Sequence, residues 1–121
     1  MVACIEGEHH ELGARMGADF LEMEGFDVRF LGANVPRESL VALVVETSPD
    51  VVGLSVAMTF NIPELEATVE AIRAALDPAP TILVGGHVVE ESPEIADRLG
   101  LCILGSNAEH LVVRCKEKLG C

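Results

Sequence analysis

Short apolar runs alternate with amphipathic stretches along the chain. Runs rich in Val, Ile and Leu are typical of buried parallel strands, and apolar residues at helical spacing are typical of helices that pack on such a sheet. The alternation therefore predicts βα units joined into a parallel sheet. The predicted strands are 2–5, 27–31, 51–55, 81–84 and 101–104. The predicted helices are 11–24, 36–47, 63–76, 92–100 and 108–119.

These elements predict a single α/β domain over residues 1–121 with a flavodoxin-like, or Rossmann-like, fold. We expect a five-stranded parallel sheet in the order 2-1-3-4-5, with 51–55 in the middle and helices on both faces. In that order the winding reverses between the first and third strands, and ligands bind outside the carboxyl ends of the strands there. The residues that follow each strand are therefore the candidates for function.

Composition narrows the classes of partner. Hydrophobic residues make up 50% of the chain and aromatic residues only 3%, which predicts an aliphatic core. Eight basic against 20 acidic residues give a formal charge of -12, which repels phosphate groups and excludes direct nucleic-acid contact. Neither a membrane span nor a signal peptide is visible, so we expect a cytoplasmic protein with no membrane partner. The four cysteines lack CxxC spacing and are expected to be reduced and unpaired.

The first predicted strand is followed by an unusual concentration of imidazoles and carboxylates in 6–11. His10 can ligate a metal through one ring nitrogen while the other donates to the Glu8 carboxylate. In an extended loop Glu8 and His10 would point to the same side and His9 away, and Gly13 would let a bulky ligand approach the helix start. Two structural alternatives stay open: histidines are common in surface loops, and the helix dipole alone favours acidic residues at a helix start. A zinc site, in turn, needs three or four protein ligands, for which this segment has no clear set.

The third predicted strand places hydroxyl groups at the adjacent strand end. Ser55 can extend a His10–Glu8–Ser55 hydrogen-bond relay, and Thr59 follows it. Alternatively, both hydroxyls only satisfy backbone groups of the loop. The residue chemistry alone favours neither interpretation.

The fourth and fifth strand ends supply weaker candidates. Gly85 and Gly86 let a ligand lie against bare backbone, although an ordinary turn needs glycine as often. His87 either contacts the same ligand or is a solvated loop residue. Gly105 and Ser106 precede the last predicted helix, where backbone N–H groups either bind a phosphate or form an ordinary cap.

Together these segments resemble the cobalamin-binding domain family of methionine synthase, corrinoid methyl carriers, carbon-skeleton mutases and light-sensing transcription regulators. The resemblance covers nearly the whole chain. The family's DxHxxG signature is matched by Glu8-x-His10-x-x-Gly13, with Glu in place of Asp. Its SxLxT signature is matched by the run from Ser55 to Thr59, with Ala57 in place of Leu, and its glycine pair by Gly85-Gly86.

The resemblance implies cobalamin bound base-off, as adenosylcobalamin or methylcobalamin, with His10 as the lower axial ligand of cobalt. Glu8 and Ser55 would tune His10. The nucleotide tail of the cofactor would lie near Ser55, Thr59 and Gly85-Gly86, in a pocket reshaped by Ala57.

The Glu form of the first signature is similar to that of light-responsive regulators, which implies a sensory module without catalysis of its own. The main alternative is a methyl-carrier domain of a cobalamin-dependent methyltransferase system. A flavodoxin-like domain that binds heme, another cofactor or none is the third. Relatives usually carry a helical cap that covers the upper face of cobalt, and this sequence does not contain it. We therefore expect a cap domain or a partner protein to cover that face. A homo-oligomer is a further alternative.

Overall fold

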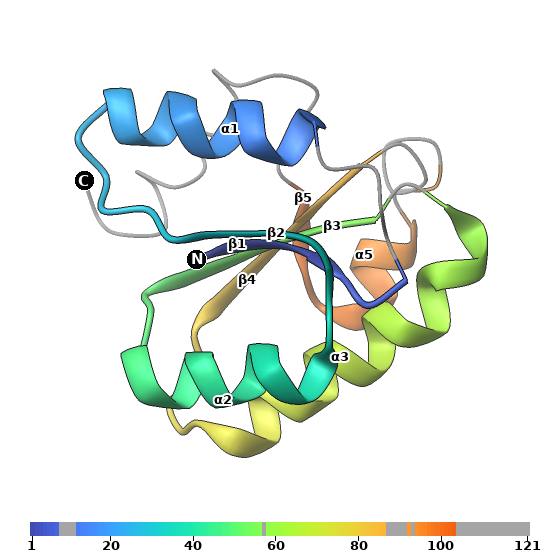
Figure 1. Ribbon diagram of the computed structural model, residues 1–121. Coiled ribbons are helices and arrows are strands. Elements are labelled where there is room, and N and C mark those ends of the chain that lie inside the picture. Colours follow the sequence, from blue (N-terminus) through green and yellow to red (C-terminus); the bar gives the residue numbers. More distant parts are fainter. Residues whose placement is uncertain (8–11, 57, 87–91, 93, 104–121) are drawn as a thin grey trace.

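The computed structural model describes residues 1–7, 12–56, 58–86, 92 and 94–103, with the backbone alone at 12, 13, 102 and 103. Its centre is a parallel sheet covered by helices on both faces (Figure 1). The predicted α/β class is thus confirmed. The predicted helix 108–119 lies outside the described residues.

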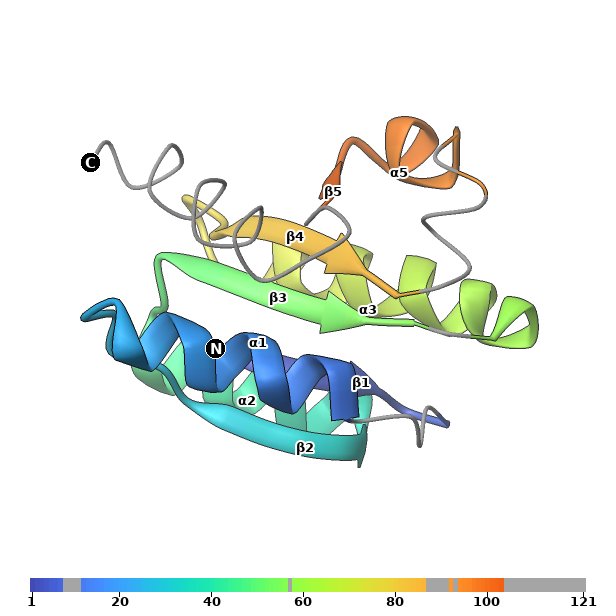
Figure 2. The same ribbon diagram turned by 90° about the horizontal axis from the view of Figure 1, so that it is seen from above.

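All strand pairs of the sheet are parallel, and the strands follow one another in the order β2-β1-β3-β4-β5 (Figure 2). The winding reverses between β1 and β3, as predicted. The fifth strand is described over two residues only, within the predicted range 101–104. The strands are β1 (Val2–Ile5), β2 (Phe30–Val35), β3 (Val51–Ser55), β4 (Thr81–Gly85) and β5 (Cys102–Ile103).

The prediction for the second strand, 27–31, is wrong by several residues, because β2 spans Phe30–Val35. The register with β1 explains the difference. Val2 pairs with Phe30 and Ile5 pairs with Val35, so the pairing extends well beyond residue 31. Gly32 and Asn34 resemble a turn in the sequence, yet both lie in the strand at positive φ (88° and 49°), and the ladder shifts register there.

The helices form two layers around the sheet (Figure 1). One face is covered by α1, and the opposite face by α2 and α3, which pack against each other. Pro36 was predicted to open α2 from inside the helix but is its N-cap residue, one position earlier. The helices are α1 (Leu12–Met23), α2 (Arg37–Thr47), α3 (Ile62–Ala75) and α5 (Glu94–Leu99), with a short 3₁₀ helix η1 (Thr59–Asn61) before α3.

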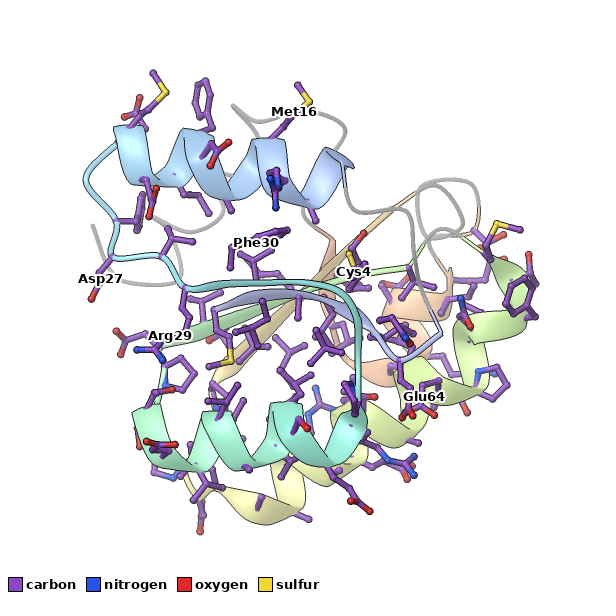
Figure 3. All side chains as sticks on the ribbon, viewed as in Figure 1. Cys4, Met16, Asp27, Arg29, Phe30 and Glu64 are labelled. Carbon is purple, nitrogen blue, oxygen red and sulfur yellow. The ribbon has the colours of Figure 1, made fainter. Side chains whose placement is uncertain are left out.

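The buried face of α1 differs from the one that its large apolar residues suggest. Met16, Phe20 and Met23 recur at helical spacing in the sequence, but Met16 is 61% and Met23 82% exposed. Figure 3 shows Met16 pointing away from the sheet. The buried residues are instead Gly17, Ala18 and Leu21, because small residues let the helix backbone approach the sheet closely.

The main core lies between the sheet and the α2, α3 layer. Leu65, Val69, Ile72 and Leu76 recur at helical spacing in the sequence. The first three are buried in α3, whereas Leu76 is its C-cap residue and only half-buried. Arg73 of α3 donates hydrogen bonds to the carbonyls of Leu99 (2.9 Å) and Gly100 (3.1 Å) and thereby holds the end of α5. Among the helices that the structure describes, none is long and apolar enough to span a membrane.

We predict that Leu54→Ala lowers the free energy of unfolding by about 2–5 kcal/mol, the usual cost of a cavity in a core. Leu54 is fully buried in β3, between Ala3 of β1 and Val84 of β4. Val45→Ala on α2, where Val45 is 46% exposed, is the control and should change this free energy by less than about 0.5 kcal/mol. Urea denaturation followed by circular dichroism measures both, and equal losses would contradict the assigned core.

Candidate functional site

The candidate site lies where β1, β3 and β4 end. Because the strands are parallel, their carboxyl ends share one edge of the sheet. Ser55, the last residue of β3, pairs with Cys4 of β1 on one side and with Gly85 of β4 on the other. Cys4 and Gly85 are buried and Ser55 is half-buried, so this edge offers a hydroxyl next to backbone that carries no side chain.

The chain approaches itself very closely after β4. Gly86 has φ 113°, and a Cβ atom built on it would lie 2.1 Å from the carbonyl oxygen of Val56. The N–H of Val56 donates to the carbonyl of Gly85 at 2.9 Å, which continues the β3–β4 pairing beyond Ser55. Gly86 is therefore needed by the fold itself, so its presence alone does not indicate a ligand. Gly85, paired with Ser55 at the strand end, adds no side chain to this edge.

Two other predicted residues lie near this edge. Thr59 is the first residue of η1 and is exposed. Gly13 belongs to the first turn of α1, which begins on the carboxyl-end side of the sheet (Figure 1). The structure thus brings Ser55 together with Gly85 and Gly86. The other predicted residues lie outside the described part of the chain: Glu8, His9, His10, Ala57, His87, Gly105 and Ser106.

The described residues at this edge offer one hydroxyl and the backbone of a glycine to a ligand. In the ranges that the structure describes, no group of three His, Cys, Asp or Glu side chains can hold a metal ion. Ser55 and the bare backbone of Gly85 suit a bulky ligand that makes few, directed hydrogen bonds. A corrin, which supplies the equatorial ligands of its cobalt, has these properties.

Beside this edge lies a polar contact that the sequence did not indicate. Gly7, two residues after β1, donates its N–H to Oδ1 of Asn34 in β2 at 2.7 Å. Nδ2 of Asn61 in η1 makes a long, 3.5 Å hydrogen bond to the carbonyl of Gly7. Asn34 lies beyond the predicted strand 27–31, and Asn61 lies just before the predicted helix 63–76. The one available signal was that Asn tolerates positive φ, which Asn34 adopts.

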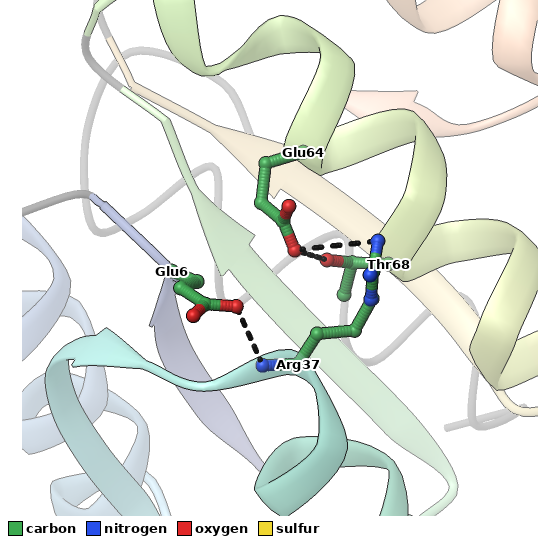
Figure 4. Close-up of polar contacts among 4 residues, drawn as sticks. All are labelled: Glu6, Arg37, Glu64 and Thr68. Atoms are coloured by element: carbon green, nitrogen blue, oxygen red, sulfur yellow. Dashed lines mark hydrogen bonds and ion pairs between the residues drawn. The ribbon is translucent and has the colours of Figure 1, made fainter.

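A second chain of contacts joins the end of β1 to α2 and α3 (Figure 4). The Glu6 carboxylate accepts the backbone N–H of Arg37 at 3.2 Å, at the start of α2. Pro36 makes no side-chain cap there, so Glu6 satisfies a helix-end donor from a distant part of the sequence. The Arg37 guanidinium lies 3.7 Å from the carboxylate of Glu64, which also accepts a 3.4 Å hydrogen bond from the Thr68 hydroxyl.

Comparison with known proteins identifies relatives along nearly the whole chain. A sequence model described as the B12 binding domain matches residues 1–113. The chain is 28% identical to dimethylamine corrinoid protein 1 of Methanosarcina acetivorans over 116 residues, which cover 95% of this chain and 54% of that protein. It is 33% identical to the HTH-type transcriptional repressor CarH of Myxococcus xanthus over 101 residues, which cover 84% of this chain and 34% of that protein.

Among solved structures, a cobalamin-binding protein of Desulfitobacterium hafniense superimposes with a TM-score of 0.86 at 30% identity. The match covers 97% of this chain and 56% of that one. The chain therefore spans about half the length of the corrinoid protein and of the D. hafniense chain, and about a third of the repressor.

At Gly86 an added side chain costs stability in two ways, through the close approach of Val56 and through the positive φ, and a matched variant separates the two costs. We predict that Gly86→Ala destabilises the fold by about 1–3 kcal/mol more than Gly25→Ala, because its Cβ must displace the Val56 carbonyl. Gly25 is the matched control: its φ is 94°, yet a Cβ there would meet nothing within 4 Å, so only the left-handed backbone costs about 1 kcal/mol. Urea denaturation gives both values. Equal losses would show that β3 and β4 do not approach this closely.

Proposed function

We propose that this chain, which belongs to the B12-binding domain family, binds cobalamin at the carboxyl ends of β1, β3 and β4. The observation that carries the proposal is the pairing of Ser55 with Gly85 at this edge, directly beside the end of β1. From β1 the chain continues into the segment with His10. We also propose that the sheet has the five strands of a flavodoxin-like fold and that its last strand spans 101–104.

In the proposed complex the cofactor is base-off, and His10 is the lower axial ligand of cobalt. One imidazole nitrogen would bind cobalt while the other donates to Glu8, which fixes the tautomer and raises the basicity of the ligand. The position of Ser55 beside β1 supports a hydrogen bond from its hydroxyl to Glu8. The cofactor supplies its organocobalt chemistry, and the protein residues orient it.

The nucleotide tail of the cofactor is assigned to the same edge. Ser55, Gly85 and the exposed Thr59 lie at this edge. Ala57 would widen the pocket for the tail, because the family signature has the larger Leu at this position. The remaining predicted contacts to the cofactor are Gly13, Gly86, His9, His87, Gly105 and Ser106.

We also propose that a helical cap domain or a partner protein covers the upper face of cobalt. The chain spans only about half the length of the corrinoid protein and of the D. hafniense chain, so there is room for such a domain in a longer protein. A homo-oligomer is one way to provide this cover.

We further propose a sensory or regulatory role, in which loss of the upper ligand of adenosylcobalamin changes a protein contact. The Glu8-x-His10-x-x-Gly13 form and the similarity to the repressor CarH support this role. The charge of -12 favours acting through protein rather than nucleic-acid contacts. A methyl carrier for a methyltransferase is the second candidate, supported by the similarity to a dimethylamine corrinoid protein over 95% of this chain.

We predict that the protein reconstituted with hydroxocobalamin shows the absorbance spectrum of imidazole-ligated, base-off cobalamin, and that His10→Ala loses it. The affinity of His10→Ala should fall by at least about tenfold, because loss of a mere outer-shell partner already costs 10–100-fold at metal sites. His9→Ala is the matched control and should keep the imidazole-ligated spectrum, because His9 is a proposed contact to the cofactor but not the proposed ligand of cobalt. A wild-type protein without a cobalt-imidazole spectrum would refute the proposed ligation.

Light separates the two roles. We predict that illumination of the protein loaded with adenosylcobalamin changes its oligomeric state or its binding to a partner, measured by size-exclusion chromatography before and after photolysis. The same protein loaded with hydroxocobalamin is the control, and illumination should leave its oligomeric state and partner binding unchanged. A photolysed cofactor with no change in assembly, together with methyl transfer from a methyltransferase, would favour the carrier.

A further inference from the structure

The residue at which the chain turns away from β1 is held from two sides. Gly7 adopts φ 90°, and its N–H and C=O both engage side-chain amides. Asn34 of β2 accepts from the N–H at 2.7 Å, and Asn61 of η1 donates to the carbonyl at 3.5 Å. Asn34 belongs to β2, which pairs with β1 on one side, and Asn61 belongs to η1, which follows β3, the strand that pairs with β1 on the other side.

Both asparagine side chains lie against Gly7. Asn61 occupies the N-cap position of α3 and is only 5% exposed, but its side chain makes no cap hydrogen bond. A Cβ on Gly7 would lie 2.9 Å from Oδ1 of Asn61, so the amide packs directly on the glycine backbone. Asn34 adopts φ 49°, a conformation that Asn tolerates better than most residues, and this places its Oδ1 next to the Gly7 N–H.

Glu6 adds a third attachment just before Gly7. Its carboxylate accepts the Arg37 N–H, and Arg37 in turn pairs with Glu64 of α3. The end of β1 is thereby joined to β2, α2, η1 and α3 within two consecutive residues. The φ and ψ angles of Gly7, which glycine by itself leaves free, are restricted by these contacts.

We propose that Asn34 and Asn61 are positioning residues that set the direction in which the chain leaves β1, and so place His10 for ligation. His10 follows Gly7 by three residues. A small rotation at Gly7 would move the imidazole by more than the roughly 0.5 Å that a ligand site tolerates. The inference rests on the proposed role of His10 and adds the residues that orient it.

Asn34 is the better residue to change, because it is exposed and its loss leaves the core intact. Asn34→Gly removes the amide and keeps the positive φ accessible, whereas Asn34→Asp keeps an acceptor oxygen for the Gly7 N–H. Ser48→Gly is the matched control, since Ser48 has φ 45° at the end of α2, the opposite end of the helix from Arg37.

The first measurement is hydrogen exchange of the Gly7 amide by NMR on the cofactor-free protein. We expect Asn34→Gly to speed this exchange about fivefold, the effect of losing one ordinary hydrogen bond, and Asn34→Asp and Ser48→Gly to leave it unchanged. An unchanged rate in Asn34→Gly would overturn the inference without any reference to the cofactor.

The second measurement is titration with hydroxocobalamin. We expect the ratio of imidazole-ligated to unligated bound cofactor to fall about tenfold in Asn34→Gly and to recover in Asn34→Asp. Asn61→Ala should act in the same direction, with urea denaturation to separate its effect on stability. A wild-type imidazole spectrum that is unchanged in Asn34→Gly would overturn the inference and leave the proposed function standing. A wild-type protein without that spectrum would overturn both.

Discussion

β1 lies inside the sheet and is hydrogen-bonded to β2 on one side and to β3 on the other. Parallel pairing brings the carboxyl ends of all three strands to one edge of the sheet, with the end of β1 between the other two. Asn34 of β2 and Asn61 of η1, the element that follows β3, both reach Gly7 with their side chains. The geometry of the candidate site follows from this pairing.

Close backbone packing gives the same edge its shape. Gly7 and Gly86 both have positive φ, and an added Cβ would collide with Asn61 at one and with the Val56 carbonyl at the other. Ser55 and Gly85, between these two points, leave a hydroxyl and bare backbone at the rim. An edge whose backbone is restricted in this way is organised before a ligand arrives, which reduces the ordering cost of binding a rigid cofactor.

Part of the site was predictable because it follows directly from strand ends. Ser55 and Gly85 terminate apolar runs, and the sheet order places the ends of those runs side by side. Asn34 was not predictable, because its role requires β2 to extend to Val35, four residues beyond the predicted end of the strand at Leu31. Asn61 precedes Ile62-Pro63 and resembles a helix cap, and only the packed structure directs its amide to Gly7.

The sequence by itself determined the α/β class, the parallel order of the sheet, the exact bounds of β1 and β3, and the family signatures at the strand ends. These follow from local properties: the spacing of apolar residues, the glycines and prolines between them, and the residues placed after each strand. The tertiary structure decided the extent of β2, the side of α1 that is buried, and the contacts that hold Glu6 and Gly7. These depend on strand register and on hydrogen bonds between residues far apart in the chain, which no local pattern encodes.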